Sequence, residues 1–463
     1  MFVVEVPYRE DAMRSRTRGA GAPDRPGPRP RPRRPRRARR ARAAALLAGA
    51  LLAGCCAGGG GDDGADGRIR LTVGVFGSFG YAEAGLYDAY TRLRPGVVVE
   101  QTSIARNENY YPQLLTHLGS GSGLADVQAV EVNNIAEITA TQADRLVELG
   151  TAEGVRKEDF LPWKWAQGTT RDGRTVALGT DVGPQAVCYR KDLFARAGLP
   201  TDREEVGRLW AGDWRAYLAA GRRYRANAPA GTAFVDSASG VMAAITGSSA
   251  LRFYGADGTV VYRSSPAVRE AWSVAAAFAT GGLTARLQQF TPAWDQGFAN
   301  GTFATVSCPA WMLGYIQDKA GPAGRGRWDV AAAPRPGNWG GSFLVVPRAG
   351  RHRAEAVRLA AWLTAPAQQA VLFERRGSFP SASAAYAGPS VAGARHPYFG
   401  GAPIGAVFSR AARGVPVTIL GPKDLVIAQN LADVGMLQVE QRGEPPGDAW
   451  RSAVRTIDNA LDR

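Results

Sequence analysis

Cysteine and histidine are scarce in this chain, and their scarcity limits its chemistry. Among 463 residues there are four cysteines and three histidines, and the histidines stand far apart, at positions 117, 352 and 396. A structural metal site usually needs several Cys or His ligands at short, regular spacings. The sequence has no such cluster, so we predict no metal site and no cofactor.

Sequence motifs of common enzymes are also missing. There is no HExxH motif and no recognisable Ser/His/Asp arrangement. The glycine-rich stretches Gly77–Gly80 and Gly119–Gly123 match neither the dinucleotide-binding fingerprint nor the P-loop, so we interpret them as turns between strands and helices. These absences give no support to hydrolysis by a metalloprotease-type site or a catalytic triad, and we assign no catalytic residues.

Positive charge is plentiful, but outside one terminal segment the excess is small. Of 56 basic and 41 acidic residues, residues 1–54 hold 14 and 4, a net of +10. The remaining 42 basic and 37 acidic residues give a net of only +5. Nucleic-acid-binding domains carry a basic patch on the folded body. We therefore predict no nucleic-acid partner.

No apolar run of the N-terminal region is long enough to span a bilayer. The basic segment Arg31–Arg42 is followed by 12 residues, Ala43–Gly54, which are too few to cross a hydrocarbon core of ~30 Å as a helix. A basic segment before such a run is typical of a secretory signal peptide, whereas a nucleic-acid-binding arm would leave the run unexplained. The run ends in Leu52-Ala53-Gly54-Cys55, which resembles the bacterial lipobox. The resemblance implies cleavage before Cys55 and lipidation of its thiol.

The stretch after Cys55 is rich in glycine and aspartate and has the composition of a flexible tether. We predict a signal peptide over residues 1–54 and a lipidated tether over residues 55–67. The body is then expected to be a monomer at the extracellular face of the cell membrane, held there by the lipid anchor alone.

The body alternates strand and helix patterns, and its length suggests more than one domain. Strand-like segments at 69–76, 97–102 and 126–131 are separated by helix-like segments at 82–94 and 110–118. This alternation predicts an α/β fold with a parallel sheet and helices on its faces. In such sheets, ligands bind beyond the carboxyl ends of the strands. Further along, we expect one long helix over residues 354–376.

The segment Phe303–Ile316 combines a strand, a cysteine, a breaker and an aromatic residue. Phe303–Cys308 has strand composition, Pro309 ends the strand, and Trp311 stands at the start of an expected helix. Trp311 is either core or part of a ligand site. Cys308 and Cys188 either form a disulfide, which export permits, or remain buried thiols. If they are joined, their strands are neighbours, and two crossings of the chain lie side by side.

Four stretches together resemble the family 1 extracellular solute-binding proteins of ABC sugar importers, of the maltodextrin-binding-like type. They are Thr175–Phe194 (TVALGTDVGPQAVCYRKDLF), Trp294–Ile316, Asn338–Pro347 (NWGGSFLVVP) and Gly377–Ser381 (GSFPS). The GTDVGP, CYRKDLF and SCPAWMLGYI blocks are similar to the cello-oligosaccharide-binding lipoproteins of actinobacterial importers.

This resemblance implies two α/β lobes that close over a sugar by bending at a hinge. The expected N-terminal lobe comprises residues 68–180 and 309–375, and the C-terminal lobe comprises residues 181–308 and 376–463. The expected function is capture of cellobiose or a short cello-oligosaccharide and its delivery to the permease subunits of an ABC importer.

The candidate ligand contacts are of two kinds. Aromatic rings match the apolar C–H face of a pyranose, and polar side chains at strand ends bind its hydroxyls. The candidates are Trp311, Trp339, Trp294 and Phe79 among the aromatic residues, and Asp181, Asn133, Glu131, Ser78 and Asp236 among the polar ones.

Two other functions fit parts of the same evidence. A secreted glycosidase would also have aromatic subsites and would need two carboxylates ~5–9.5 Å apart, which the composition alone does not exclude. The resemblance to solute-binding proteins argues against it and implies that the protein is not an enzyme. A receptor for another solute, such as an amino acid, a polyamine or an iron complex, would share the fold.

Overall fold

Three β-sheets organise residues 67–462, the part of the chain that this computed structural model describes. The predicted signal peptide, the lipobox cysteine and nearly all of the tether lie outside these residues. No helix within them combines the length and the apolar composition needed to cross a bilayer.

The N-terminal sheet has five strands in the order β2-β1-β3-β10-β4. Strand β1 is parallel to both β2 and β3, which confirms the predicted parallel arrangement, whereas β10 is antiparallel to β3 and β4. The strands are β1 (Ile69–Phe76), β2 (Val97–Ile104), β3 (Val127–Glu131), β4 (Leu178–Gly179) and β10 (Ser342–Val345). The helices packed around them are α1 (Leu86–Leu93), α2 (Asn107–Ser120), α3 (Val132–Thr141), α4 (Pro162–Gln167), α12 (Arg353–Leu363) and α13 (Pro366–Arg376).

Both faces of this sheet are buried, and the side chains of β10 alternate between them. Phe343 and Val345 pack in one apolar cluster, with α2 and α3. Leu344 packs in the other, with α1 and α12. This alternation follows from the two-residue period of a strand, so a sheet covered on both sides needs apolar residues at nearly every position.

The C-terminal sheet has four strands in the order β7-β8-β6-β9. They are β6 (Gln185–Arg190), β7 (Ala233–Val235), β8 (Phe303–Pro309) and β9 (Trp328–Ala332). The main helices around this sheet are α5 (Lys191–Arg196), α6 (Arg203–Arg208), α7 (Trp214–Asn227), α8 (Ala238–Gly247), α9 (Pro266–Thr280), α10 (Pro292–Asn300), α11 (Met312–Ala320) and α15 (Ile404–Gly414).

The chain passes between the two large sheets three times. The first crossing contains β5 (Asp181–Val182), the second lies between β9 and β10, and the third contains β11 (Phe379–Pro380). Strands β5 and β11 pair with each other in a separate two-stranded sheet. The sequence-based prediction places the return to the N-terminal lobe at residue 309. That position was wrong, because β9 pairs along its length with β6 in the C-terminal sheet.

Cys188 and Cys308 are joined by a disulfide in the structure, with their Cα atoms 5.7 Å apart. Their strands, β6 and β8, are antiparallel neighbours. The bond therefore lies inside the C-terminal sheet. It does not link two crossings, because β8 is not a crossing strand.

Two predicted helices differ from the observed ones. The long helix expected over residues 354–376 is divided into α12 and α13 at Thr364 and Ala365. Pro366 causes the division, because it has no N–H to continue the helix and forces the residue before it into an extended conformation. Likewise, α11 begins at Met312, since β8 runs on to Pro309.

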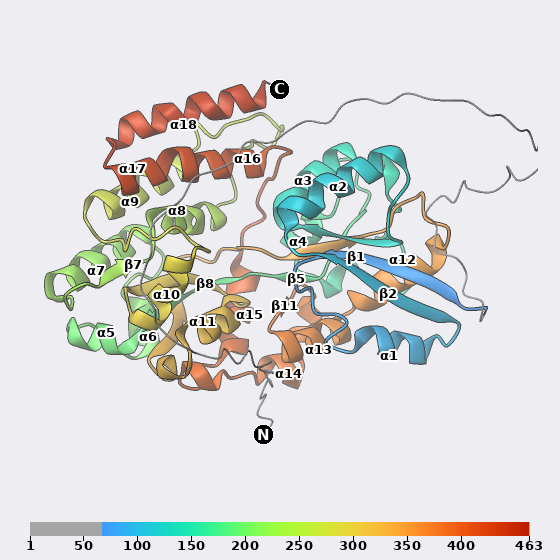
Figure 1. Ribbon diagram of the computed structural model, residues 1–463, viewed down its shortest axis with the longest axis horizontal. Helices are drawn as coiled ribbons and strands as arrows, with labels where there is room; N and C mark the ends of the chain where they lie inside the picture. The colour runs from blue at the N-terminus through green and yellow to red at the C-terminus, as the bar shows by residue number, and fades with distance from the viewer. Residues whose placement is uncertain (1–66, 463) are drawn as a thin grey trace, which may run out of the picture. The chain divides into compact units, whose positions relative to one another are not determined.

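The last part of the chain packs on the C-terminal sheet's helices. Helices α16 (Asp424–Gln429), α17 (Leu437–Arg442) and α18 (Pro446–Leu461) follow one another, and a π-helical stretch, Asn430–Met436, joins the first two. Figure 1 shows α17 and α18 (red) near α8 and α9 (yellow-green), which come far earlier in the chain. The remaining short elements are α14 (Pro389–Ala392) and 3₁₀ turns at Ala143–Arg145, Lys157–Asp159, Pro322–Gly324, Ser383–Ala387 and Pro397–Phe399.

Candidate functional site

Two of the predicted polar residues, Glu131 and Asn133, lie where β3 ends and α3 begins. The carboxylate of Glu131 caps α3 by accepting hydrogen bonds from the backbone N–H of Asn133 (3.0 Å) and from its side-chain amide (3.1 Å). A carboxylate at this position also benefits from the positive end of the helix dipole. Asn133 is exposed and Glu131 is half-buried, so both are held at the rim of the sheet.

Asp181 is brought to the same end of the sheet by the first crossing. Its Oδ1 accepts hydrogen bonds from the backbone N–H of Ser342 (2.8 Å) and the hydroxyl of Thr180 (2.7 Å). Ser342 pairs with Glu131 across β10 and β3. The two predicted carboxylates, separated by 50 positions in the sequence, are therefore neighbours on adjoining segments.

A buried lysine lies beside this pair. Lys164, on α4, is 0 % exposed, and its Nζ lies 3.6 Å from the centre of the Phe343 ring. Desolvation lowers the pKa of Lys164 to about 7, although Asp181 and Glu131 both act to raise it. Desolvation likewise raises the pKa of Glu131 to about 7 against the lowering effect of Asn133 and Lys164. Sequence reasoning missed Lys164, whose only signal was its place between two tryptophans.

An aromatic cluster occupies the second crossing and the segments beside it. The rings of Trp311 and Trp339 lie 5.5 Å apart, and those of Phe290 and Trp339 6.0 Å apart. The indole N–H of Trp311 donates to the carbonyl of Trp339 (3.0 Å), so the bond fixes the ring without using its face. Trp311 and Trp339 are half-buried, and Phe290 is 54 % exposed.

Phe290 was not among the predicted contacts. It lies in the loop before α10 and adopts a left-handed φ of 64°, which is unusual for a residue with a side chain. Strained conformations of this kind gather at functional sites. The sequence indicates only weakly that Phe290 belongs to the site. An aromatic residue just before a helix that starts at Thr-Pro is equally consistent with packing in the core.

Close backbone packing joins the aromatic cluster to the carboxylates. The backbone N–H of Trp339 donates to the carbonyl of Gly183 (2.8 Å), and the Gly183 N–H donates to the side chain of Asn338 (2.9 Å). A Cβ atom on Gly183 would overlap the carbonyl oxygen of Trp339. Gly183 lies two residues after Asp181, so the first and second crossings hold the two halves of the site together.

Ser78 and Phe79 lie in the turn that follows β1. Ser78 is exposed, while the Phe79 ring is half-buried between Phe76 (5.6 Å) and Tyr81 (5.2 Å). Tyr81, which the sequence did not single out, is fully buried; burial raises the pKa of its hydroxyl, and the nearby charge of Asp181 adds to the effect. This turn therefore lies close to Asp181.

Asp236 and Trp294 are brought together, but inside the protein. Trp294 is 0 % exposed, and its indole N–H donates to Asp236 (2.9 Å), which also accepts from Gln289 (2.7 Å). Burial raises the pKa of Asp236 to about 6. In this conformation both side chains support the Phe290 loop from within, since the rings of Trp294 and Phe290 lie 5.1 Å apart. Neither presents a surface to a ligand.

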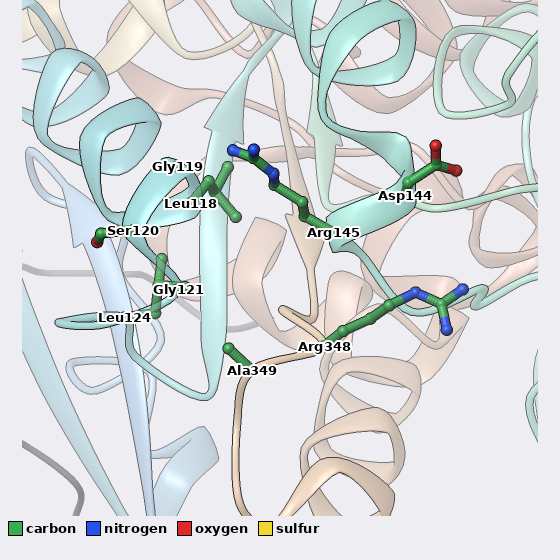
Figure 2. A pocket seen from close by; sticks show the side chains of 9 residues that line it. All are labelled: Leu118, Gly119, Ser120, Gly121, Leu124, Asp144, Arg145, Arg348 and Ala349. Carbon is green, nitrogen blue, oxygen red and sulfur yellow. The ribbon is translucent and has the colours of Figure 1, made fainter.

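A surface cavity of about 330 Å³ lies elsewhere (Figure 2). It is at the opposite end of the N-terminal sheet, since Leu124 precedes β3 and Arg348 follows β10. Arg145 reaches toward Gly119 in Figure 2, while Asp144 and Arg348 point away. None of the predicted site residues lines this cavity. The described residues also contain no group of three His, Cys, Asp or Glu side chains able to hold a metal ion.

Comparison with known proteins assigns the family. Residues 86–397, about two thirds of the chain, match the family described as bacterial extracellular solute-binding protein. This chain belongs to that family. Its members bind solutes and are not enzymes, so the glycosidase alternative is set aside. A search of curated proteins found no match.

Solved structures support the same assignment. A crystal structure of an extracellular solute-binding protein of family 1 is 40% identical to this bacterial extracellular solute-binding protein; the match covers 85% of this chain and 100% of that one, with a TM-score of 0.79. The sugar-binding protein MalE from Xanthomonas citri is 18% identical, covers 85% and 98%, and has a TM-score of 0.69. The fold is therefore the predicted two-lobed, maltodextrin-binding-like α/β fold.

A third structure is that of the galacto-N-biose/lacto-N-biose I-binding protein of the ABC transporter from Bifidobacterium longum, in complex with lacto-N-biose. It is 19% identical to this chain, covers 87% of it and 98% of its own length, and has a TM-score of 0.70. At this level of identity the likeness supports the fold.

Proposed function

We propose that this solute-binding protein captures an oligosaccharide and delivers it to an ABC importer. Cellobiose or a short cello-oligosaccharide is the proposed ligand, because of the similarity of the GTDVGP, CYRKDLF and SCPAWMLGYI blocks to cello-oligosaccharide-binding lipoproteins. A structural neighbour that binds the disaccharide lacto-N-biose supports the carbohydrate class.

The observation that carries the proposal is the pairing of partly exposed aromatic rings with carboxylates. Trp311, Trp339 and Phe290 provide flat apolar surface on one side, and Asp181 and Glu131 provide acceptors on the other, joined through the first two crossings. A pyranose presents an apolar C–H face and a rim of hydroxyls. A site for a free amino acid would have less use for several aromatic platforms. A polyamine would also fit aromatic faces beside carboxylates, because its ammonium groups are attracted to both, so the titration below includes polyamines.

Asp181 is suited to bind a sugar hydroxyl. Within the described residues, the carboxylate of Asp181 accepts two hydrogen bonds, both at Oδ1. Its other oxygen, Oδ2, remains available as an acceptor. The exposed side chains of Asn133 and Ser78 supply further donors and acceptors in the same region. Such pairing matters because a buried unpaired hydroxyl costs about 1–3 kcal/mol.

Export and anchoring complete the proposal. The basic and apolar N-terminal segments and the lipobox-like Leu52–Cys55 support a lipid-anchored monomer at the extracellular face of the membrane. In this arrangement the two lobes rotate about the three crossings, close over the sugar and present it to the permease subunits.

Isothermal titration calorimetry with the purified mature protein tests the ligand. The panel contains cellobiose, cellotriose, maltose, lactose and glucose, together with amino acids and polyamines. We expect heat of binding with the β-linked glucose oligomers. Binding only to an amino acid or a polyamine, or to none of the sugars, would reject the carbohydrate proposal.

Anchoring is tested separately. Mass spectrometry of the N-terminal peptide is expected to find a lipidated Cys55, and Cys55→Ser is expected to prevent this modification. If the mature protein instead begins before residue 55 and Cys55 carries no lipid, the anchoring proposal is wrong. The sugar-binding proposal is unaffected by that result.

A further inference from the structure

Lys164 is a charged side chain that the solute site does not yet account for. It is fully buried, and its Nζ has no hydrogen-bond acceptor among residues 67–462. Its Nζ lies over the face of Phe343, 3.6 Å from the ring centre. A buried amine without an acceptor is costly to maintain, so its position needs an explanation.

All three crossings pack around this side chain. Gly179 stands at the start of the first crossing. A Cβ atom on it would lie 2.8 Å from Cγ of Lys164 and also 2.8 Å from the hydroxyl of Ser381, which belongs to the third crossing. A Cβ atom on Gly341, at the end of the second, would lie 3.2 Å from Nζ. The lysine thus stands at the centre of the hinge, where larger residues at these two glycines would displace it.

The charged groups that face Lys164 come from two elements. Glu131 at the end of β3 and Asp181 of β5 both interact with it electrostatically, and Tyr81 faces Asp181 from the turn before α1. Among the described residues, no ion pair within 4 Å joins either carboxylate to Lys164. Glu131 accepts hydrogen bonds from Asn133, and Asp181 accepts them from Ser342 and Thr180. The fully buried amine therefore acts on these partly buried carboxylates through its charge and not through a direct hydrogen bond.

We propose that Lys164 is a positioning residue of the binding site, whose charge keeps Glu131 and Asp181 ionised so that they accept hydrogen bonds from the bound solute. The inference rests on the proposed function for the identity of the solute. A neighbouring cation favours the ionised form of a carboxylate, and the carboxylates in return favour the ammonium form. By reciprocity, a solute that binds the ionised carboxylates also favours protonated Lys164.

The first test is the pH dependence of sugar affinity in two variants of opposite effect. In the wild type, affinity is expected to fall as the pH drops through about 7, because Glu131 takes up a proton there. Lys164→Met removes the charge. The pH at the midpoint of the loss of affinity is therefore expected to rise by about one unit or more, and sugar binding at pH 7 is expected to be about tenfold weaker than in the wild type. Lys164→Arg stays charged throughout and is expected to lower the midpoint.

The exposed Lys157, seven residues away, provides the control. Lys157→Met changes the net charge equally and is expected to leave the profile unchanged. If both Lys164 variants weaken binding equally at every pH and leave the midpoint unchanged, Lys164 has only a packing role and the inference is rejected.

A second measurement needs no Lys164 variant. The chain has only five lysines, at positions 157, 164, 191, 319 and 423, so ¹³Cε-labelled lysine gives five side-chain NMR signals. One signal is expected to titrate near neutral pH. The midpoint of this titration is expected to shift to higher pH when sugar is added and to lower pH in Glu131→Gln. Titration of all five near the ordinary value of about 10.4 would overturn the inference.

The two proposals fail in different ways. If no sugar binds the wild-type protein, the proposed ligand is wrong. The effect of Glu131→Gln on the titration of the Lys164 signal, measured without sugar, still decides whether the lysine and the carboxylate are coupled. If sugar binds and that shift is absent, only the role of Lys164 is rejected.

Discussion

At the scale of single residues, environment separates tryptophans that the sequence treats alike. Trp311 has its N–H paired with a backbone carbonyl and remains half-buried beside Phe290. Trp294 has its N–H paired with a buried carboxylate and no exposed surface. Both residues are well anchored, but only Trp311 retains exposed surface that a ligand can contact.

Replacing Trp311 with alanine is therefore expected to weaken sugar binding strongly. Loss of one stacking platform should cost at least about 1.4 kcal/mol, a tenfold rise in Kd. Calorimetry measures the change. Leu93→Ala is the control, since Leu93 is 61% exposed on α1 and is expected to leave Kd unchanged. Equal affinities of Trp311→Ala and wild type would remove Trp311 from the site.

His396 gives a prediction on stability. Burial, with help from Arg325, lowers its pKa from 6.5 to about 4. Between these values the unfolded chain binds the proton more readily than the folded one, so the free energy of unfolding should fall as the pH drops from about 6.5 to 4. His396→Gln should lose this contribution and show a flatter dependence.

Urea denaturation at pH 7 and pH 4.5 checks the His396 prediction. Asp236, with its pKa raised to about 6, acts in the opposite direction, but it is present in both proteins and cancels in the difference. An equal loss of stability between the two pH values in variant and wild type would contradict the assignment.

At the scale of elements, the close packing of the crossings requires glycine at the points where one backbone lies against another. Gly183 lies directly against the carbonyl of Trp339, and any side chain would force the first two crossings apart. Asp181 and Trp339 would then move relative to each other, although neither is changed. The sequence identified this stretch as part of a solute-binding pattern, but it contained no sign of which backbone it touches.

Gly183→Ala is expected to weaken sugar binding by tenfold or more and to lower the melting temperature. Gly314→Ala is the matched control, because a Cβ atom there, on the exposed side of α11, meets nothing within 4 Å. In a helix interior this exchange should be neutral or stabilising by about 0.5–1 kcal/mol. Calorimetry and thermal unfolding of both variants measure the difference, and a harmless Gly183→Ala would show that the crossings can separate without loss of function.

At the scale of the whole molecule, different apolar clusters cover the two large sheets, and three crossings join the sheets. One cluster of the C-terminal sheet also takes in Trp163 of α4 and Phe373 of α13. Apolar clusters fill both faces of each sheet, while β5 and β11 form only a two-stranded link. Well-packed lobes joined by a few extended residues favour rotation of one lobe against the other over deformation within either.

Sugar binding is accordingly expected to make the protein more compact. Small-angle X-ray scattering should show a smaller radius of gyration at saturating cellobiose than without it. Trp311→Ala at the same cellobiose concentration should remain close to the ligand-free value. An unchanged radius in wild type at full saturation would show that the lobes do not close.

The sequence by itself determined the fold class, the parallel start of the first sheet and the family, because two-residue and helical periodicities and contiguous motifs are local signals. It also singled out Asp181, Glu131 and Trp311 at strand ends. Only the folded structure shows that the chain returns to the first sheet after β9 and not at residue 309, that Trp294 and Asp236 face inward, and that Lys164, Phe290 and Tyr81 lie beside the candidate site. These outcomes depend on contacts between residues that belong to different elements of the chain, and such contacts leave no periodic or local trace in the sequence.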